Sequence, residues 1–249
     1  MITLKTREQI ERMRKAGRVT AGALDAVSRA IRVGVTTKEL DAIAEDYIRS
    51  HGGIPSFKGY NGFPGSICAS VNEEVVHGIP SDRKLKEGDI IGVDTGVILD
   101  GWQGDSARTF AVGKISDEAQ HLIDVTQQSF YQALEVCRQG YRIGDIGHAV
   151  QSYAEANGCS VVRDLCGHGI GREMHEDPEV PNFGRQGRGI RLQKGLAIAI
   201  EPMLNYGSWS VRSLSDGWTI VTADGSLSAH YEHTVVITDG EPEILTLLD

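Results

Sequence analysis

The sequence predicts a mixed α/β protein made of two similar halves, because one order of elements occurs twice along the chain. In each half a long helix is followed by a short helix and then by strands. Laid over one another at an offset of 106 residues, the two regions match Gly34 with Gly140, Glu39 with Asp145, Leu40 with Ile146, Tyr47 with Tyr153, and Gly52 with Gly158. Helices often share such patterns by coincidence, but the common order of elements favours a duplication.

No linker rich in proline or serine separates the two regions. We therefore expect one fused domain over residues 1–249, with halves of approximately 6–113 and 116–240.

The first half begins with two helices that carry start and stop signals. Thr6-x-x-Gln9 is typical of a capping box, apolar residues follow at helical spacing as far as Ile31, and Gly34 is expected to close the helix. A second helix is expected from Thr36-x-x-Glu39 to His51-Gly52-Gly53.

A short strand is expected around 66–71, followed by a hairpin over 88–110 that turns at Asp100-Gly101. Pairing across this turn sets Asp94 opposite Ala107 and Asp105 opposite Gly96, so the two aspartates lie diagonally on one face of the hairpin. Two carboxylates within apolar strands repel one another and are costly to bury, and a cation between them removes both problems. Two polar residues on an exposed face remain the alternative.

In the second half, Ser116 is expected to open a long helix that Gly140 ends, and a shorter helix should precede Asn157-Gly158. Polar groups then occur in apolar or glycine-rich contexts. His168 lies in CGHGIG, His175 follows in MHEDP, Glu201 ends LAIAIEP, and Glu232 lies in the strand-like SAHYEHTVVIT. Glu201 lies 107 residues after Asp94, in the equivalent strand of the second half.

Together Asp94, Asp105, His168, Glu201 and Glu232 provide one imidazole and four carboxylates, with no thiolate. Such a set suits Mn²⁺, Fe²⁺ or Co²⁺, and also accepts Zn²⁺. Its four negative charges balance two divalent cations, which leaves open positions for a metal-bound hydroxide and a substrate. The reaction class that this predicts is metal-assisted hydrolysis. Each residue also has an ordinary alternative, such as a turn glutamate or a loop histidine.

The composition of the chain excludes several classes of protein function. The 249 residues have a formal net charge of −9, which argues against nucleic acid or an anionic membrane as the main partner. No apolar run approaches the length of a membrane span, the N-terminal residues lack the apolar core of a signal peptide, and the four cysteines form no C-x-x-C pair. The expectation is a cytoplasmic enzyme or binding protein.

Five segments give the chain a specific resemblance. VNEEVVHGIP (71–80), GVDTGVILDGWQGDSARTF (92–110), CGHGIGREMHEDPEVPN (166–182), IAIEPM (198–203) and DGWTIVTADGSLSAHYEHT (216–234) closely resemble type I methionine aminopeptidases, in the short bacterial form. The similarity runs from the first helix to the last strand. It implies the pita-bread fold, two pseudo-symmetric halves of helices packed on antiparallel sheet around a dimetal site.

The resemblance also implies roles for the residues at the site. Asp94 would bind one metal ion, His168 and Glu201 the second, and Asp105 and Glu232 would bridge the two. A bridging hydroxide would attack the scissile carbonyl with Glu201 assisting proton transfer, His175 would donate a hydrogen bond to the carbonyl oxygen, and His77 would contact substrate near the leaving amine. Structural loop histidines are the alternative for His77 and His175.

The methionine pocket of the family maps onto Tyr60, Phe63, Cys68 and Trp218. Two neighbouring positions depart from the common bacterial pattern, with Phe57 where a cysteine is common and Met174 where phenylalanine is common. Both changes remain apolar, so methionine selectivity should survive.

The implied substrate is the N-terminus of a nascent protein with a small second residue, and the implied assembly is a monomer. Arg185, Arg188, Arg191 and Lys194 form a basic loop that either contacts ribosomal RNA near the tunnel exit or is simply solvated. Two other readings stay open: a prolidase or aminopeptidase P, which usually carries an additional N-terminal domain, and a non-catalytic binding module, which typically loses metal ligands.

Overall fold

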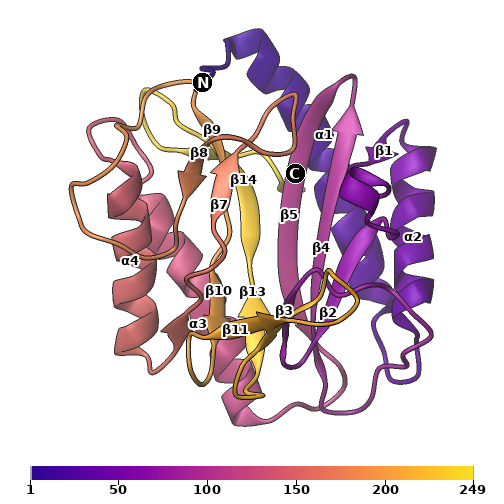
Figure 1. Cartoon of the computed structure of the whole chain (residues 1–249). Helices are drawn as coiled ribbons and strands as arrows, with labels where there is room; N and C mark the ends of the chain where they lie inside the picture. The colour runs from indigo at the N-terminus through magenta and orange to yellow at the C-terminus, as the bar shows by residue number, and fades with distance from the viewer. Residues whose placement is uncertain (1, 249) are drawn as a thin grey trace.

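A computed structural model describes residues 2–248, and its centre is a nine-stranded sheet in which every pairing is antiparallel. The main path runs β1-β4-β5-β14-β9-β7-β8, while β2 pairs with β4 and β15 with β14 (Figure 1). These strands are β1 (Ile54–Pro55), β2 (Ile67–Val71), β4 (Ile90–Leu99), β5 (Trp102–Ala111), β7 (Gly167–Gly169), β8 (Glu176–Val180), β9 (Ala197–Ile200), β14 (Glu232–Val236) and β15 (Glu243–Ile244).

Two three-stranded sheets complete the β structure. One has the order β13-β10-β6 and the other β11-β12-β3. Their strands are β3 (Glu74–Val76), β6 (Ser160–Val161), β10 (Met203–Asn205), β11 (Val211–Ser213), β12 (Ile220–Thr222) and β13 (Ser228–His230). The expected mixed α/β class, with helices packed on antiparallel sheet, is confirmed.

The helices of the first half begin where their capping boxes predict. Helix α1 (Arg7–Ala30) starts after Thr6 and α2 (Thr37–Ser50) after Thr36, each with both capping-box hydrogen bonds present. The expected end of α1 at Gly34 was wrong, because the backbone is already extended at Ile31 (φ −66°, ψ 119°). Gly34 instead lies in the following turn, where its N–H donates to the carbonyl of Leu85.

The second half has α3 (Asp117–Glu135), capped by Ser116, and α4 (Ile143–Ala156). The expected end of α3 at Gly140 was also wrong, because the backbone at Val136 is no longer helical (φ −103°, ψ 2°). Cys137 therefore lies beyond the helix but is still fully buried. Helices α1 and α2 lie on the right of the sheet in Figure 1 and α3 and α4 on the left.

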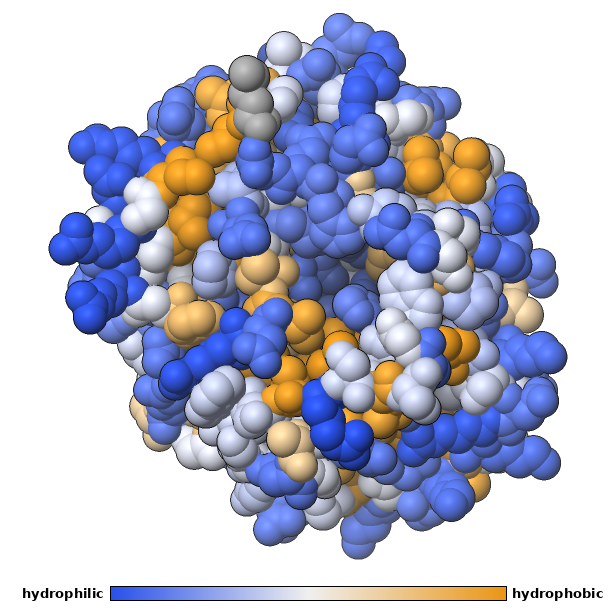
Figure 2. All heavy atoms as spheres, in the orientation of Figure 1, coloured by the Kyte–Doolittle hydropathy of each residue, from blue (hydrophilic) through white to orange (hydrophobic). Residues whose placement is uncertain are grey.

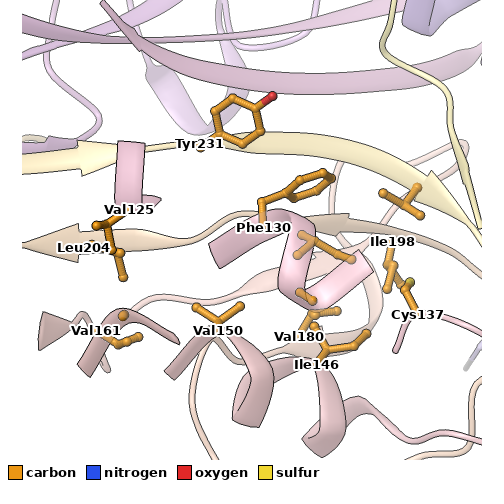
Figure 3. Close-up of a cluster of buried hydrophobic side chains, with 14 of the residues drawn as sticks. Val125, Phe130, Cys137, Ile146, Val150, Val161, Val180, Ile198, Leu204 and Tyr231 are labelled. Carbon is orange, nitrogen blue, oxygen red and sulfur yellow. The ribbon is translucent and has the colours of Figure 1, made fainter. Parts of the chain in front are cut away.

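Two apolar clusters fix these helix pairs to the sheets. In the first half, Leu24 of α1 and Leu40 of α2 are buried with Ile67, Ile91 and Val93 of the sheet. In the second half, the ring of Phe130 in α3 packs near Tyr231, above a layer that includes Val150 and Val180 (Figure 3). Burying such side chains is the main stabilising contribution to a fold of this size.

The hairpin prediction is confirmed residue by residue. Asp100 and Gly101 both have positive φ, 51° and 74°, as a two-residue type I′ turn requires. The register pairs Asp94 with Ala107 and Gly96 with Asp105. The two aspartates therefore share one face of the hairpin.

Within residues 2–248, no helix combines the length and hydrophobicity needed to cross a membrane. The predicted extent of the domain includes Met1 and Asp249, which lie outside the described residues, and its division into halves stays a prediction.

Candidate metal centre and substrate cavity

One cavity of about 240 Å³ brings together every site residue that the sequence predicted. Figure 2 shows the molecule hollowed near the middle of the face that looks out from the central strands. Lining this cavity are Phe57, Tyr60, Asn61, Phe63, Cys68, His77, Asp94, Asp105, His168, Met174, His175, Glu201, Trp218 and Glu232. The structure thus brings the predicted residues together, while their assignment to a site and their individual roles remain proposals.

The five candidate metal ligands come from five consecutive strands of the central sheet. Along the path β4-β5-β14-β9-β7, Asp94 lies on β4, Asp105 on β5 and Glu232 at the start of β14, Glu201 directly follows β9, and His168 lies on β7. Asp105 is held to β14 by Thr234, whose hydroxyl accepts from its N–H and donates to its carbonyl, both at 3.0 Å. Strand register thus determines which side chains meet.

The spacing of the ligand atoms fits a shared cation. Atoms of Asp105, His168 and Glu232 all lie within 4.8 Å of one another. His168 Nε2 is 3.7 Å from Asp105 Oδ2 and 3.6 Å from Glu201 Oε1, which is too long for a hydrogen bond. Two ligand atoms that each lie ~2.1 Å from one ion are separated by ~3–4 Å, so these gaps suit metal coordination.

The tautomer of His168 also suits a metal ligand. Its Nδ1 lies 2.9 Å from the carbonyl oxygen of Gly169, which can only accept, so Nδ1 carries the proton. The lone pair of Nε2 then faces the carboxylates, and the backbone hydrogen bond fixes the orientation of the ring.

Without a cation the carboxylates are poorly satisfied. Burial is the main cause that raises the pKa of Asp105 to about 7 and the pKa values of Asp94, Glu201 and Glu232 well above their usual range, with neighbouring carboxylates adding to the shift in the last three. Asp94 Oδ1, Asp105 Oδ1 and Glu232 Oε1 are buried without a hydrogen-bond partner in the described structure. Buried, mutually repelling oxygen atoms of this kind fit divalent cations, which supply the missing positive charge.

Two further histidines stand over the carboxylates. His77 follows β3 and adopts φ 60°, a left-handed conformation that is uncommon for a residue with a side chain. The ring of His175 lies 4.3 Å from that of His168, and its Nδ1 is hydrogen-bonded to the Tyr60 hydroxyl at 2.8 Å. Burial lowers the pKa of both His77 and His175, so both are neutral near pH 7.

The opposite wall of the cavity is apolar. Phe63 meets Trp218 edge to face, with ring centroids 5.1 Å apart, and Cys68 pairs with Asp94 in the β2–β4 register. Phe57 and Met174 pack over Gly96, where a Cβ atom would lie 3.0 Å from Phe57 Cε1 and 2.8 Å from Met174 Cε. The absence of a side chain at Gly96 therefore lets both residues close the pocket over the hairpin.

Sequence reasoning missed two residues of this region, Asn61 and His230. Asn61 lines the cavity beside Tyr60. His230 is 3% exposed, and its Nε2 lies 3.8 Å from Glu201 Oε2 and 3.9 Å from Glu232 Oε2. Burial lowers its pKa to about 3. The signal that could have found it is its position two residues before Glu232, on the same face of an extended chain.

The comparisons with known proteins agree with this site. The model of metallopeptidase family M24 matches residues 11–239. The chain is 56% identical over 248 residues to a methionine aminopeptidase of Clostridium perfringens, covering 100% of both sequences. The crystal structure of methionine aminopeptidase from Rickettsia prowazekii superposes with a TM-score of 0.98 at 46% identity, covering 99% of this chain and 100% of that one.

A prolidase from Pyrococcus furiosus superposes with a TM-score of 0.78 at 22% identity, covering 99% of this chain and 66% of that one. At that identity the likeness concerns the fold alone. The expected pita-bread architecture is confirmed by these neighbours. The family match over most of the chain and the full-length relatives above 50% identity establish that this chain belongs to metallopeptidase family M24, among its methionine aminopeptidases.

Proposed function

We propose that this protein is a metal-dependent aminopeptidase that removes the N-terminal methionine from newly made proteins whose second residue is small. The observation that carries the proposal is the convergence of four carboxylates, of which Asp105 and Glu232 are buried, with His168 in one cavity that also has an apolar wall. The methionine aminopeptidases that match the whole chain support the same activity.

Asp94, Asp105, His168, Glu201 and Glu232 would hold two divalent ions, of which Mn²⁺, Fe²⁺ and Co²⁺ suit the donor set best and Zn²⁺ also fits. When bound, the ions supply a water acidified towards neutrality and a Lewis acid for the scissile carbonyl. The ligand set supports two ions because its four carboxylates, once ionised, carry four negative charges.

Two residues of the site, Glu201 and His175, would transfer or donate protons during the reaction. Glu201 would accept a proton from the attacking water and return it to the amine nitrogen as the C–N bond breaks. His175 would donate from Nε2 to the carbonyl oxygen as that oxygen gains charge. The 2.8 Å contact between the Tyr60 hydroxyl and His175 Nδ1 fits this role, because a hydroxyl that donates there leaves the proton of the neutral ring on Nε2.

His77 would bind the substrate near the scissile amide and the leaving amine. Its ring lies 6.4 Å from that of Trp218, at the border between the polar and apolar parts of the cavity. Phe57, Tyr60, Phe63, Cys68, Met174 and Trp218 would enclose the methionine side chain. An unbranched thioether suits such a pocket because it adapts to irregular apolar walls and makes favourable contacts with aromatic rings.

The activity is tested by measuring free methionine released from Met-Ala-Ser and Met-Leu-Ser. Apo-protein is titrated with Mn²⁺, Co²⁺, Fe²⁺ or Zn²⁺, and Asp105→Ala serves as the control. We expect metal-dependent cleavage of the alanine peptide alone, abolished by the substitution. Cleavage of x-Pro peptides instead would favour a prolidase, and folded protein that is inactive with every metal would favour a binding module.

Arg185, Arg188, Arg191 and Lys194 are all exposed, which supports a further role for this loop in contacting ribosomal RNA near the tunnel exit. Lys194 also pairs with Asp239, so the three arginines are the better test. Reversing their charge should abolish salt-sensitive co-sedimentation with ribosomes. Unchanged co-sedimentation would mean that the loop is simply solvated.

We also propose that the protein acts in the cytoplasm, where newly made proteins emerge, and that it acts as a monomer. Sedimentation velocity over a range of concentrations tests the oligomeric state: a mass above 27.0 kDa that rises with concentration would contradict a monomer.

A further inference from the structure

His230 is a buried imidazole at the metal centre to which the ligand set above gives no role. Its side chain is 3% exposed, and Nε2 has no hydrogen-bond partner in the described structure. An unpartnered buried nitrogen is costly unless something occupies the space that it faces. What it faces are two carboxylates of the proposed metal centre.

The geometry of His230 matches that of His168. His168 Nε2 lies 3.6 and 3.7 Å from two carboxylate oxygens, and His230 Nε2 lies 3.8 and 3.9 Å from two others. The two histidines lie beside different oxygens of Glu201, His168 beside Oε1 and His230 beside Oε2. Glu201 is thus flanked by two imidazole nitrogens at similar distances.

The backbone around His230 is fixed from two sides. Its N–H donates to Thr109 Oγ1 at 2.9 Å, and the same hydroxyl donates back to its carbonyl at 3.0 Å. His230 also pairs with Met203 of β10, two residues after Glu201. The ring therefore reaches the carboxylates from a rigid strand, which is how ligands are preorganised.

We propose that His230 is a sixth protein ligand of the metal centre, with Nε2 binding the ion on the side of Glu201 Oε2 and Glu232 Oε2. The inference deepens the proposed function and rests on its metal centre. A second imidazole makes the centre richer in nitrogen, which favours Co²⁺ and Zn²⁺ over Mn²⁺ relative to a set with one imidazole.

The test is a count of metal-bound histidines in the intact wild-type protein. The chain has eight histidines, so ring signals of protein labelled with ¹⁵N-histidine can be followed one by one in long-range ¹H–¹⁵N NMR spectra. Up to two equivalents of Zn²⁺, which is diamagnetic, are added to apo-protein. We expect Nε2 of both His168 and His230 to move to the position of metal-bound imidazole.

An internal control lies three residues further on. The buried His233 has its Nδ1 beside Thr246 Oγ1 at 2.8 Å and its Nε2 beside the Tyr231 hydroxyl at 3.1 Å, so its nitrogens should stay unbound. A change in the Nε2 signal of His168 alone would overturn the inference while leaving the proposed metal centre intact. If Zn²⁺ shifts no ring-nitrogen signal, not even that of His168, the result would overturn the metal centre itself and the inference with it.

The substitution His230→Gln assigns the signal and gives a second readout by calorimetry. The amide is a weak metal ligand of similar reach, so we expect Zn²⁺ to bind at least about tenfold more weakly, the lower end of what the loss of a supporting residue around a metal costs. The loss should be smaller for Mn²⁺, which prefers oxygen ligands. Equal affinities in variant and wild type would overturn the inference. If the variant does not fold, the wild-type count still decides.

Discussion

The floor and the wall of the cavity are built in different ways. The floor consists of Asp94, Asp105, His168, Glu201 and Glu232, presented by five neighbouring strands whose pairing fixes their relative positions. The wall consists largely of side chains from loops and a short 3₁₀ turn (Tyr60–Gly62), and several of them are half-buried or exposed. Backbone hydrogen bonds thus fix the relative positions of the proposed metal ligands. Side-chain packing instead shapes the apolar pocket that is proposed to select the substrate. Changes in the floor should alter turnover and metal binding, and changes in the wall should alter selectivity.

The largest expected effect is in the floor. Asp105→Ala removes a buried carboxylate at the centre of the proposed ligand cluster, within 4.8 Å of ligand atoms of both His168 and Glu232. A metal centre contributes several kcal/mol to transition-state stabilisation, so release of methionine should fall by ~10³-fold or more. Metal binding by calorimetry should weaken in parallel. The matched control is Asp46→Ala, at an exposed position of α2, which should leave both unchanged.

The floor is also the part that sequence predicts best. Asp94 and Asp105 could be placed on one face because side chains alternate along strands and because Asp100-Gly101 specifies a two-residue turn. The observed register agrees at every pair from Ile90 to Leu99. The convergence of Glu201 and Glu232 with this hairpin depends on long-range pairing of β14 with β5 and β9, which local patterns do not specify.

The wall and the helix ends show where sequence reasoning stops. Phe57 and Met174 are separated by more than a hundred positions and meet only because Gly96 leaves room above the hairpin. Their assignment came from the resemblance to a family, not from any period in the sequence. Gly34 and Gly140 marked turns correctly, but α1 and α3 end three or more residues earlier, because a helix ends where the backbone first leaves helical geometry.

The second expected effect concerns stability of the apo-protein and pH. The raised pKa values of Asp94, Asp105, Glu201 and Glu232 mean that the folded protein retains carboxyl protons that the unfolded chain has lost. Because the unfolded state binds fewer of these protons, they make stability fall as pH rises. Buried histidines with lowered pKa values, such as His168 at about 4, act in the opposite direction, but only below about pH 6.5 where the unfolded imidazoles are charged.

Urea unfolding of apo-protein should therefore show a free energy of unfolding that declines from about pH 6.5 upwards. Each carboxyl that stays protonated contributes a slope of up to ~1.4 kcal/mol per pH unit. Added Mn²⁺ should flatten the slope by stabilising the ionised carboxylates, and Asp105→Asn should reduce it. An apo-protein whose stability rises between pH 7 and 8.5 would contradict buried, protonated carboxyls.

A smaller and more selective effect is expected in the wall. Gly96→Ala would place a Cβ atom 2.8 Å from Met174 Cε and 2.9 Å from Ser56 Cβ, forcing the pocket to shift. Overpacking of this kind costs about 1–3 kcal/mol. We expect KM for Met-Ala-Ser to rise by about tenfold, while calorimetric metal affinity stays the same.

The same strand offers a control for the Gly96 substitution. At Gly92 the nearest atoms to a new Cβ, Ser70 O and Thr109 Oγ1, lie at an ordinary 3.6 Å, so Gly92→Ala should bind and cleave the peptide normally. Combining Gly96→Ala with Met174→Ala should recover part of the lost affinity, because the shortest of the clashes, that with Met174 Cε, is removed. If KM is unaltered in Gly96→Ala, the packing of Phe57 and Met174 does not shape the pocket.

The smallest effect tests a hydrogen bond between the wall and His175, whose ring lies 4.3 Å from that of His168 in the floor. Tyr60→Phe removes only the hydroxyl that is bonded to His175 Nδ1 and keeps the ring that lines the pocket. A neutral hydrogen bond contributes about 0.5–1.5 kcal/mol, so kcat should fall by roughly two- to tenfold while KM for Met-Ala-Ser changes little. A rise in KM at constant kcat would instead mean that Tyr60 acts through the methionine pocket alone. In the first case the Tyr60 hydroxyl would affect turnover only through the histidine that it orients, so the boundary between selectivity and chemistry would lie at this hydrogen bond.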